Sequence, residues 1–159
     1  MAPLLGDGRL IRRFRRLAGH TCALAGFVIL ALAGCGGGSP SPESVVRAWT
    51  QALNADDNER AARLFAKGAE VVQGEQVRVL WTHEDAVAWN ASLPCSGRIV
   101  SITSDGPTAR ATFVLGDRAR TQCDGPGARA TAIVTVHKGK IVLWHQAPNP
   151  VNTPGQGPV

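Results

Sequence analysis

The acidic side chains of this 159-residue chain gather where the backbone is expected to turn or a helix to begin. In such places carboxylates complement helix N-termini or face solvent. A general acid or base needs a different setting, usually an apolar one that raises its pKa. None of the acids from Glu43 to Asp124 falls in an apolar strand pattern. The sequence therefore favours a domain without acid–base catalysis, and we predict no catalytic residue.

The histidine and cysteine spacings do not match a metal site. His83-Glu84 forms the first half of an HExxH zinc motif, but Val87 occupies the position of the second histidine. Cys95 and Cys123 have no further cysteine or histidine at the short spacing that zinc sites use. The sequence also shows no phosphate-binding loop, nucleophile elbow or dinucleotide fingerprint. We therefore expect neither a metal nor a cofactor.

Residues 1–34 have the composition of an export signal. Five arginines lie between positions 9 and 16, and residues 21–34 form an apolar run without charge. That run is shorter than the roughly 20 residues that span a bilayer. The segment is therefore interpreted as a signal peptide rather than a membrane-spanning helix.

The end of this segment, Leu32-Ala33-Gly34-Cys35, resembles the lipobox of bacterial lipoproteins at all four positions. The resemblance implies cleavage before Cys35, lipid attached to its thiol, and an exported domain anchored to a bacterial membrane. Two alternatives stay open. One is an ordinary secretory signal with a chance cysteine, and the other is twin-arginine export through Arg12 and Arg13.

Removal of the signal changes the charge of the chain. The whole sequence has 17 basic and 12 acidic residues, but the five arginines and Asp7 precede Cys35. The mature chain is therefore nearly neutral, and the high isoelectric point belongs to the signal. For this reason nucleic acid is not expected as a partner.

The rest of the chain is expected to contain one folded domain. Residues 35–42 form a lipidated Gly/Ser/Pro tether with a flexible composition. Residues 43–147 are long enough to bury a single hydrophobic core. Residues 148–159 contain four prolines and no charged side chain, so we expect a disordered tail there.

Three helices are predicted in the first half of the domain. Ser41-Pro42-Glu43 starts the first of them, with apolar residues recurring at helical spacing through residue 53. Asp56 with Glu59 resembles a capping box for a second helix, and Thr82 with Asp85 one for a third. Residues 70–73 and 76–81 are typical of two short strands between these helices.

Two hairpins are predicted in the second half. Residues 98–104 and 108–115 form the first, and residues 128–137 and 140–147 form the second around Lys138-Gly139, which suits a primed turn. A regular ladder across that turn pairs Val136 with Ile141 and Ala132 with His145. His145 is then the polar group nearest the centre of any cavity, beside a small neighbour.

The cysteines that remain after lipidation of Cys35 are expected to pair. Cys95 precedes the first hairpin and Cys123 follows it, so the hairpin brings them into the same region. An even pair in an oxidising compartment predicts a disulfide.

The sequence has four tryptophans and no tyrosine. Trp49, Trp81 and Trp89, together with His145, are candidates for lining a pocket for an apolar ligand. The alternative is that the tryptophans only fill the core.

Helices followed by antiparallel strands indicate an α+β fold. Residues 49–56 with 62–66, and the strand–turn–strand of residues 134–142, resemble the start and end of the SnoaL-like and nuclear-transport-factor-2-like superfamily. The resemblance implies N-terminal helices packed in a curved antiparallel sheet around a conical cavity. It also implies a homodimer through the outer face of the sheet in many members. Ketosteroid-isomerase-like members use a tyrosine and carboxyl groups in the cavity, and this chain has no tyrosine.

The leading hypothesis is a membrane-anchored envelope lipoprotein whose SnoaL-like domain binds a small apolar ligand or a partner protein without catalysis. The alternative is a small SnoaL-like enzyme of the isomerase, cyclase or dehydratase type. Such an enzyme would act on a hydrophobic substrate by acid–base chemistry.

A Cys35→Ala variant tests the anchor. Without the thiol that accepts the lipid, the chain should stay unlipidated and uncut by the lipoprotein peptidase. Metabolic labelling with a fatty-acid analogue measures this against the parent chain. Equal labelling of variant and parent would contradict the lipid anchor.

Overall fold

The computed structural model describes residues 39–148. The predicted signal peptide, Cys35 and all but the first residue of the predicted tail lie outside this range. None of the helices in the described range is long and apolar enough to cross a membrane.

Three helices precede or interrupt the strands: α1 (Pro42–Asn54), α2 (Asn58–Ala62) and α3 (His83–Ser92). The predicted caps of α1 and α3 are confirmed, because the Ser41 hydroxyl accepts from the N–H of Ser44 and Thr82 forms a capping box with Asp85. The prediction for α2 is wrong by one residue. Asp57 is its N-cap, and Asp56 adopts a positive φ of 55°.

The strands form one six-stranded sheet in the order β2-β1-β6-β5-β4-β3. All neighbours are antiparallel except β1 and β6, which run parallel. The α+β class is therefore as predicted, although three of the six strands, β1, β3 and β4, extend further than the sequence pattern indicated. The strands are β1 (Phe65–Gln73), β2 (Gln76–Leu80), β3 (Cys95–Asp105), β4 (Thr108–Asp117), β5 (Arg129–His137) and β6 (Lys140–Ala147).

Both long hairpins carry a register shift. Lys138 and Gly139 have φ values of 49° and 74°, which fits the predicted primed turn. The ladder then pairs Val136 with Ile141 but Thr135 with Leu143, so Val142 is an extra residue in β6. A similar shift in β3 leaves an extra residue between Ile99 and Ser101. Such bulges bend a strand and increase its twist, which suits a sheet that must curve.

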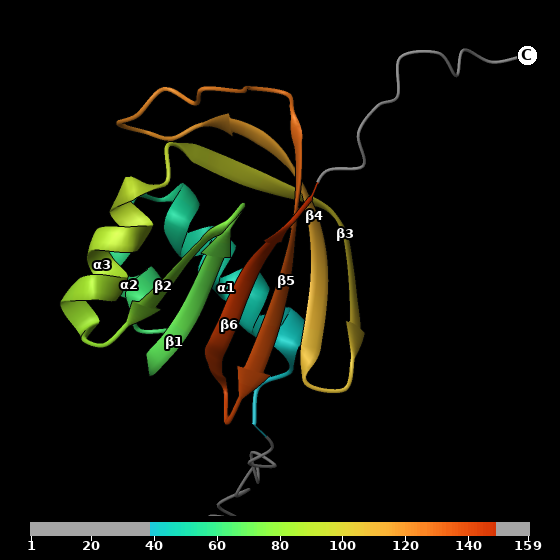
Figure 1. The fold of residues 1–159 in the computed structure, drawn as a ribbon. Coiled ribbons are helices and arrows are strands. Elements are labelled where there is room, and N and C mark those ends of the chain that lie inside the picture. The colour runs from blue at the N-terminus through green and yellow to red at the C-terminus, as the bar shows by residue number, and fades with distance from the viewer. Residues whose placement is uncertain (1–38, 149–159) are drawn as a thin grey trace, which may run out of the picture. The chain divides into compact units, whose positions relative to one another are not determined.

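The curved sheet packs its concave face against α1 (Figure 1). Side chains from α1 and from the middle strands make up one hydrophobic core. Small residues of β4 and β5, such as Ala109, Ala111 and Ala132, are fully buried under the helix. Their size leaves room for the large indole rings that occupy the rest of the concave face.

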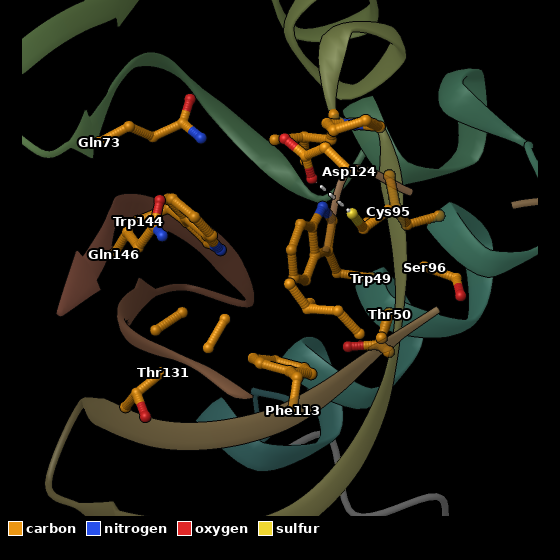
Figure 2. Close-up of a pocket in the computed structure, with 17 residues that line it drawn as sticks. Trp49, Thr50, Gln73, Cys95, Ser96, Phe113, Asp124, Thr131, Trp144 and Gln146 are labelled. Atoms are coloured by element: carbon orange, nitrogen blue, oxygen red, sulfur yellow. Dashed lines mark hydrogen bonds between the residues drawn. The ribbon is translucent and has the colours of Figure 1, made fainter. Parts of the chain in front are cut away.

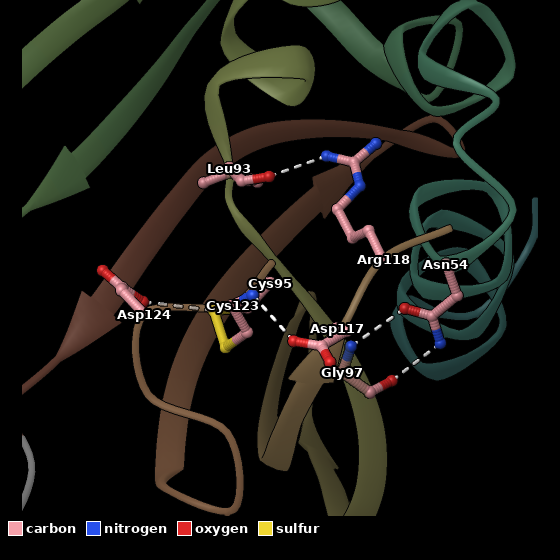
Figure 3. The surroundings of a disulfide bond; sticks show 8 residues. All are labelled: Asn54, Leu93, Cys95, Gly97, Asp117, Arg118, Cys123 and Asp124. Atoms are coloured by element: carbon pink, nitrogen blue, oxygen red, sulfur yellow. Dashed lines mark hydrogen bonds between the residues drawn. A yellow bond between two sulfur atoms is a disulfide. The ribbon is translucent and has the colours of Figure 1, made fainter. Parts of the chain in front are cut away.

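Arg118, just after β4, joins three separate segments, and Figure 3 shows its hydrogen bond to Leu93. Its guanidinium donates to the Asp56 carboxylate at 2.6 Å, to the Asn58 side chain at 2.7 Å, and to the backbone carbonyls of Asn90 and Leu93. The side chains of Arg118 and Asp56 are only 2% and 8% exposed. Because a buried charge is stable only when paired and bonded, this ion pair fixes the α1–α2 turn and the end of α3 against β4.

The predicted disulfide between Cys95 and Cys123 is present, with a Cα–Cα distance of 4.4 Å. It links the start of β3 to the loop after β4. Beside it, the Asn54 side chain donates to the carbonyl of Gly97 and accepts from its N–H, both at 2.9 Å. The end of α1 is thereby held against β3.

Replacing Arg118 with methionine should lower the free energy of unfolding by about 3–5 kcal/mol, because the Asp56 carboxylate is left buried without its counter-charge. Urea unfolding followed by circular dichroism measures this. Arg120→Met is the matched control, since Arg120 is exposed, and it should change stability by less than about 0.5 kcal/mol. Equal small losses in both variants would show that the buried pair does not hold these segments.

Candidate functional site

A cavity of about 210 Å³ lies between α1, the start of β3 and the concave face of β4, β5 and β6 (Figure 2). It is smaller than the 300–1,000 Å³ of a drug-sized ligand site. Its apolar wall consists of aromatic, aliphatic and small side chains, chiefly Trp49, Leu53, Phe113, Leu115, Ala132 and Trp144.

The aromatic side of this wall belongs to a packed cluster. Trp49 lies 5.9 Å from Trp144 and 6.4 Å from Phe113, measured between ring centroids. Trp89 packs against Trp49 and Trp144 at 6.3 and 5.1 Å. These distances are typical of stacked and edge-to-face aromatic pairs. The rings that line the cavity are thus held in place by the core behind them.

Two of the three buried indoles have a hydrogen-bond partner. The N–H of Trp49 donates to Asn90 Oδ1 at 2.8 Å, and that of Trp89 donates to Gln73 Oε1 at 3.1 Å. Trp144 is 6% exposed, and its Nε1 has no partner among the described residues. Because buried donors are nearly always satisfied, this N–H is a feature that requires an explanation.

Few polar groups line the cavity. Gln73 and Gln146 contribute half-buried amides, and Thr50, Ser96 and Thr131 contribute hydroxyls. The hydroxyl of Thr50 already donates to the backbone carbonyl of Val46 at 2.8 Å. Hydrogen bonds to a bound molecule would therefore come from a small number of neutral groups.

Asp124 is the one carboxylate among the described residues that line the cavity, and it is exposed. Its Oδ1 lies 3.3 Å from Cys95 Sγ. That carboxylate and the sulfurs of Cys95 and Cys123 come within 4.8 Å of one another, but the disulfide leaves no thiolate to bind a metal. The site thus offers neither a buried acid–base pair nor a thiolate metal centre.

The predicted place of His145 is wrong. The extra residue in β6 pairs His145 with Ile133 instead of Ala132, and Ala132 with Gln146. A shift of one residue moves every following side chain to the other face of a strand. As a result Trp144 and Gln146 line the cavity, and His145 between them faces the outer side of the sheet.

The three tryptophans proposed for the pocket occupy different places. Trp49 lines the cavity. Trp89 is 1% exposed, lies behind the lining and is a core residue. Trp81 is 62% exposed and lies outside the cavity, because it follows the inward-facing Leu80 at the end of β2. Trp144 also lines the cavity, and its N–H has no partner among the described residues.

His83 and Glu84, which begin the HExxH-like segment, lie at the surface. His83 Nε2 lies 2.8 Å from Glu59 Oε2, and both side chains are exposed. The pKa of the Glu84 carboxyl is lowered, first by a hydrogen bond from its own backbone N–H and second by one from the Thr82 side chain. Neither residue lines the cavity.

Sequence reasoning also missed the role of Asn90. This residue is fully buried, accepts from Trp49 through its side chain, and donates to the carbonyl of Ala86 at 2.8 Å. Its backbone carbonyl accepts from Arg118. No local sequence signal marks Asn90 as a buried bridge between α1 and α3.

No family model and no curated protein matches this sequence. Solved structures do resemble the fold. An NTF2-like protein of unknown function from Cytophaga hutchinsonii has a TM-score of 0.58 at 13% identity, over 72% of this chain and 95% of that one. A protein with a ketosteroid isomerase-like fold from Catenulispora acidiphila, in complex with trimethylamine, has a TM-score of 0.56 at 16% identity, over 70% and 88%.

A third structure, a candidate polyketide cyclase from Sinorhizobium meliloti, has a TM-score of 0.53 at 18% identity. That alignment covers 65% of this chain and 93% of that one. At such identities the likeness extends to the fold and not to the activity. The chain therefore has the nuclear-transport-factor-2-like fold.

Proposed function

We propose that this domain binds a small, largely apolar molecule in its conical cavity and does not change it chemically. The observation that carries the proposal is the composition of the cavity wall. Aromatic, aliphatic and small side chains form most of it, and one of its rings, Trp144, has a buried indole N–H without a partner among the described residues. An apolar cavity with a few polar groups is the usual form of a small-molecule site.

The size of the cavity limits the ligand. A volume of about 210 Å³ is roughly what seven water molecules occupy in the liquid, at about 30 Å³ each. A molecule of one substituted ring fits this space. Because Trp144 supplies a donor, the ligand should carry a hydrogen-bond acceptor such as a carbonyl oxygen.

The alternative of a SnoaL-like enzyme has less support from this cavity. General acid–base catalysis needs a titratable group within hydrogen-bond reach of the substrate, with a pKa suited to the reaction. Among the described residues that line the cavity, the candidate is Asp124, which is exposed at its rim. A cavity wall of this kind suits the binding of a ligand better than the transfer of a proton to or from it.

We further propose that lipid on Cys35 anchors this binding domain to the membrane. The lipobox-like end of the signal supports this, as does the disulfide, which suits an exported protein. The protein would then hold a small apolar molecule at the cell envelope.

Acetophenone and isopropylbenzene test the binding proposal. They have the same number of non-hydrogen atoms, but only acetophenone has an acceptor. Both should bind, and acetophenone should bind about fivefold more tightly if the Trp144 N–H contributes roughly 1 kcal/mol. A ligand-detected NMR titration of the purified protein measures the two dissociation constants.

An Ala130→Leu variant provides the control for location. Ala130 is a half-buried lining residue paired with Phe113, so a larger side chain there should fill the cavity and weaken binding of both probes. Ala119→Leu adds the same atoms at an exposed position and should leave binding unchanged. If neither probe binds the parent chain, or if Ala130→Leu binds them equally well, the cavity is not the binding site.

A further inference from the structure

A second hollow lies outside the conical cavity, between the start of β1, the end of β2 and the start of α3. This groove has a volume of about 390 Å³. Its distinctive lining residues are the cations Arg63, Lys67 and Lys140, together with Trp81 and His83. None of these residues takes part in the cavity described above.

The sheet topology brings these residues to one end of the domain. Strands β1 and β6 run parallel, so Lys67 and Lys140 near their starts lie at the same edge. Strand β2 returns antiparallel to β1 and pairs Leu80 with Ala69, which puts Trp81 at that edge as well. Trp81 lies close to Gly68, where an added Cβ would meet its ring at 3.8 Å.

The groove has an excess of positive charge. Its described lining residues include three permanent cations and no carboxylate. Glu59, which is outside the lining, is paired with His83. Lys140 is held in position because its ammonium donates to the backbone carbonyl of Arg63. An anion entering the groove would therefore meet charges that no carboxylate of the lining neutralises.

Trp81 adds an apolar contact to this charge. It is 62% exposed, whereas the other three tryptophans are 6% exposed or less. An exposed indole beside lysines and arginines is the combination that membrane proteins place at the lipid headgroup level, where the ring is half apolar and the cations meet phosphate.

The chain enters the described domain at this same end (Figure 1). Pro40 packs against Gly139, where an added Cβ would come within 3.0 Å of the proline ring, and Lys140 is the next residue. Three glycines separate Cys35 from Ser39. Four residue steps reach at most about 14 Å when fully extended, so lipid on Cys35 would keep this end close to the headgroups.

We propose that the groove of Arg63, Lys67, Trp81 and Lys140 binds the anionic phospholipid headgroups of the membrane that carries the protein. The proposal rests on the lipid anchor proposed above. The anchor supplies attachment, and the groove fixes which face of the domain lies on the bilayer. The contact should be salt-sensitive, because exposed charges at the surface are screened within about 8–10 Å at physiological salt.

Acrylamide quenching of tryptophan fluorescence tests the contact, because acrylamide is neutral and Trp81 is the exposed indole. The membrane-purified protein is reconstituted in vesicles of phosphatidylcholine, with or without phosphatidylglycerol. Phosphatidylglycerol should protect Trp81 severalfold from quenching, and high salt should remove the protection. A Trp81→Phe variant gives the signal of the buried rings.

An Arg63→Gln/Lys67→Gln variant should weaken the contact by about fivefold for each lost cation, while the Lys140 hydrogen bond to the backbone is kept. Arg98→Gln/Arg110→Gln removes the same charge from exposed positions on β3 and β4, at the other side of the sheet, and should retain protection. If both double variants lose protection from quenching, the effect depends only on the net charge of the protein, and the proposal is wrong. If inorganic phosphate alone protects Trp81 equally well, the groove binds a soluble anion and the proposal is also wrong.

The intact mass of the same sample reports lipid on Cys35 independently. If Cys35 carries no lipid, the proposed anchor is wrong. Acrylamide quenching of the full chain in neutral detergent micelles with added phosphatidylglycerol then still decides whether the groove binds the headgroup. If Cys35 is lipidated and phosphatidylglycerol gives no salt-sensitive protection, the groove proposal is wrong and the anchor stands.

Discussion

The contact among Trp49, Trp89 and Trp144 is the interaction on which the core and the cavity both depend. A sheet curved around one long helix leaves a wide space at one end of its concave face, and three indoles occupy much of it. Trp49 is fixed through Asn90, and Asn90 through Arg118, so the aromatic contact is tied to the turn after α1 and the end of α3. The cavity is the part of the cone that these rings do not fill.

Local signals predicted the elements of the fold because they act within a few residues. The hydroxyl of Ser41, the capping box of Thr82 and the glycine after Lys138 each determine a helix start or a turn through local hydrogen bonds or backbone freedom. The disulfide was also predictable, since the hairpin between its cysteines limits where they can lie. These features required no knowledge of how distant segments pack.

The cavity could be predicted only in part, because it depends on irregularities without a local signal. A single extra residue at Val142 exchanges His145 for Trp144 on the concave face, and nothing in the sequence of β6 marks that bulge. Trp81 and Trp89 have the same residue type, yet one is exposed and one is buried. Their positions follow from the pairing of β2 and the packing of α3, which are long-range contacts.

The two candidate binding surfaces lie at opposite ends of β6. Lys140 begins the strand in the cationic groove, whereas Gln146 near its end lines the conical cavity beside the half-buried Gln73 at the end of β1. With the groove on the membrane, the end of β6 that lines the cavity would point away from the bilayer.

The indole N–H signals of the ¹⁵N-labelled protein test the central claim most directly. Four signals are expected, one for each tryptophan, and single Trp→Phe variants assign them. If the cavity binds an acceptor-bearing ligand, saturating acetophenone should shift the Trp144 proton downfield as its N–H gains a partner, and the exposed Trp81 should not move. A Trp144 signal that stays in place while another site responds would contradict the account.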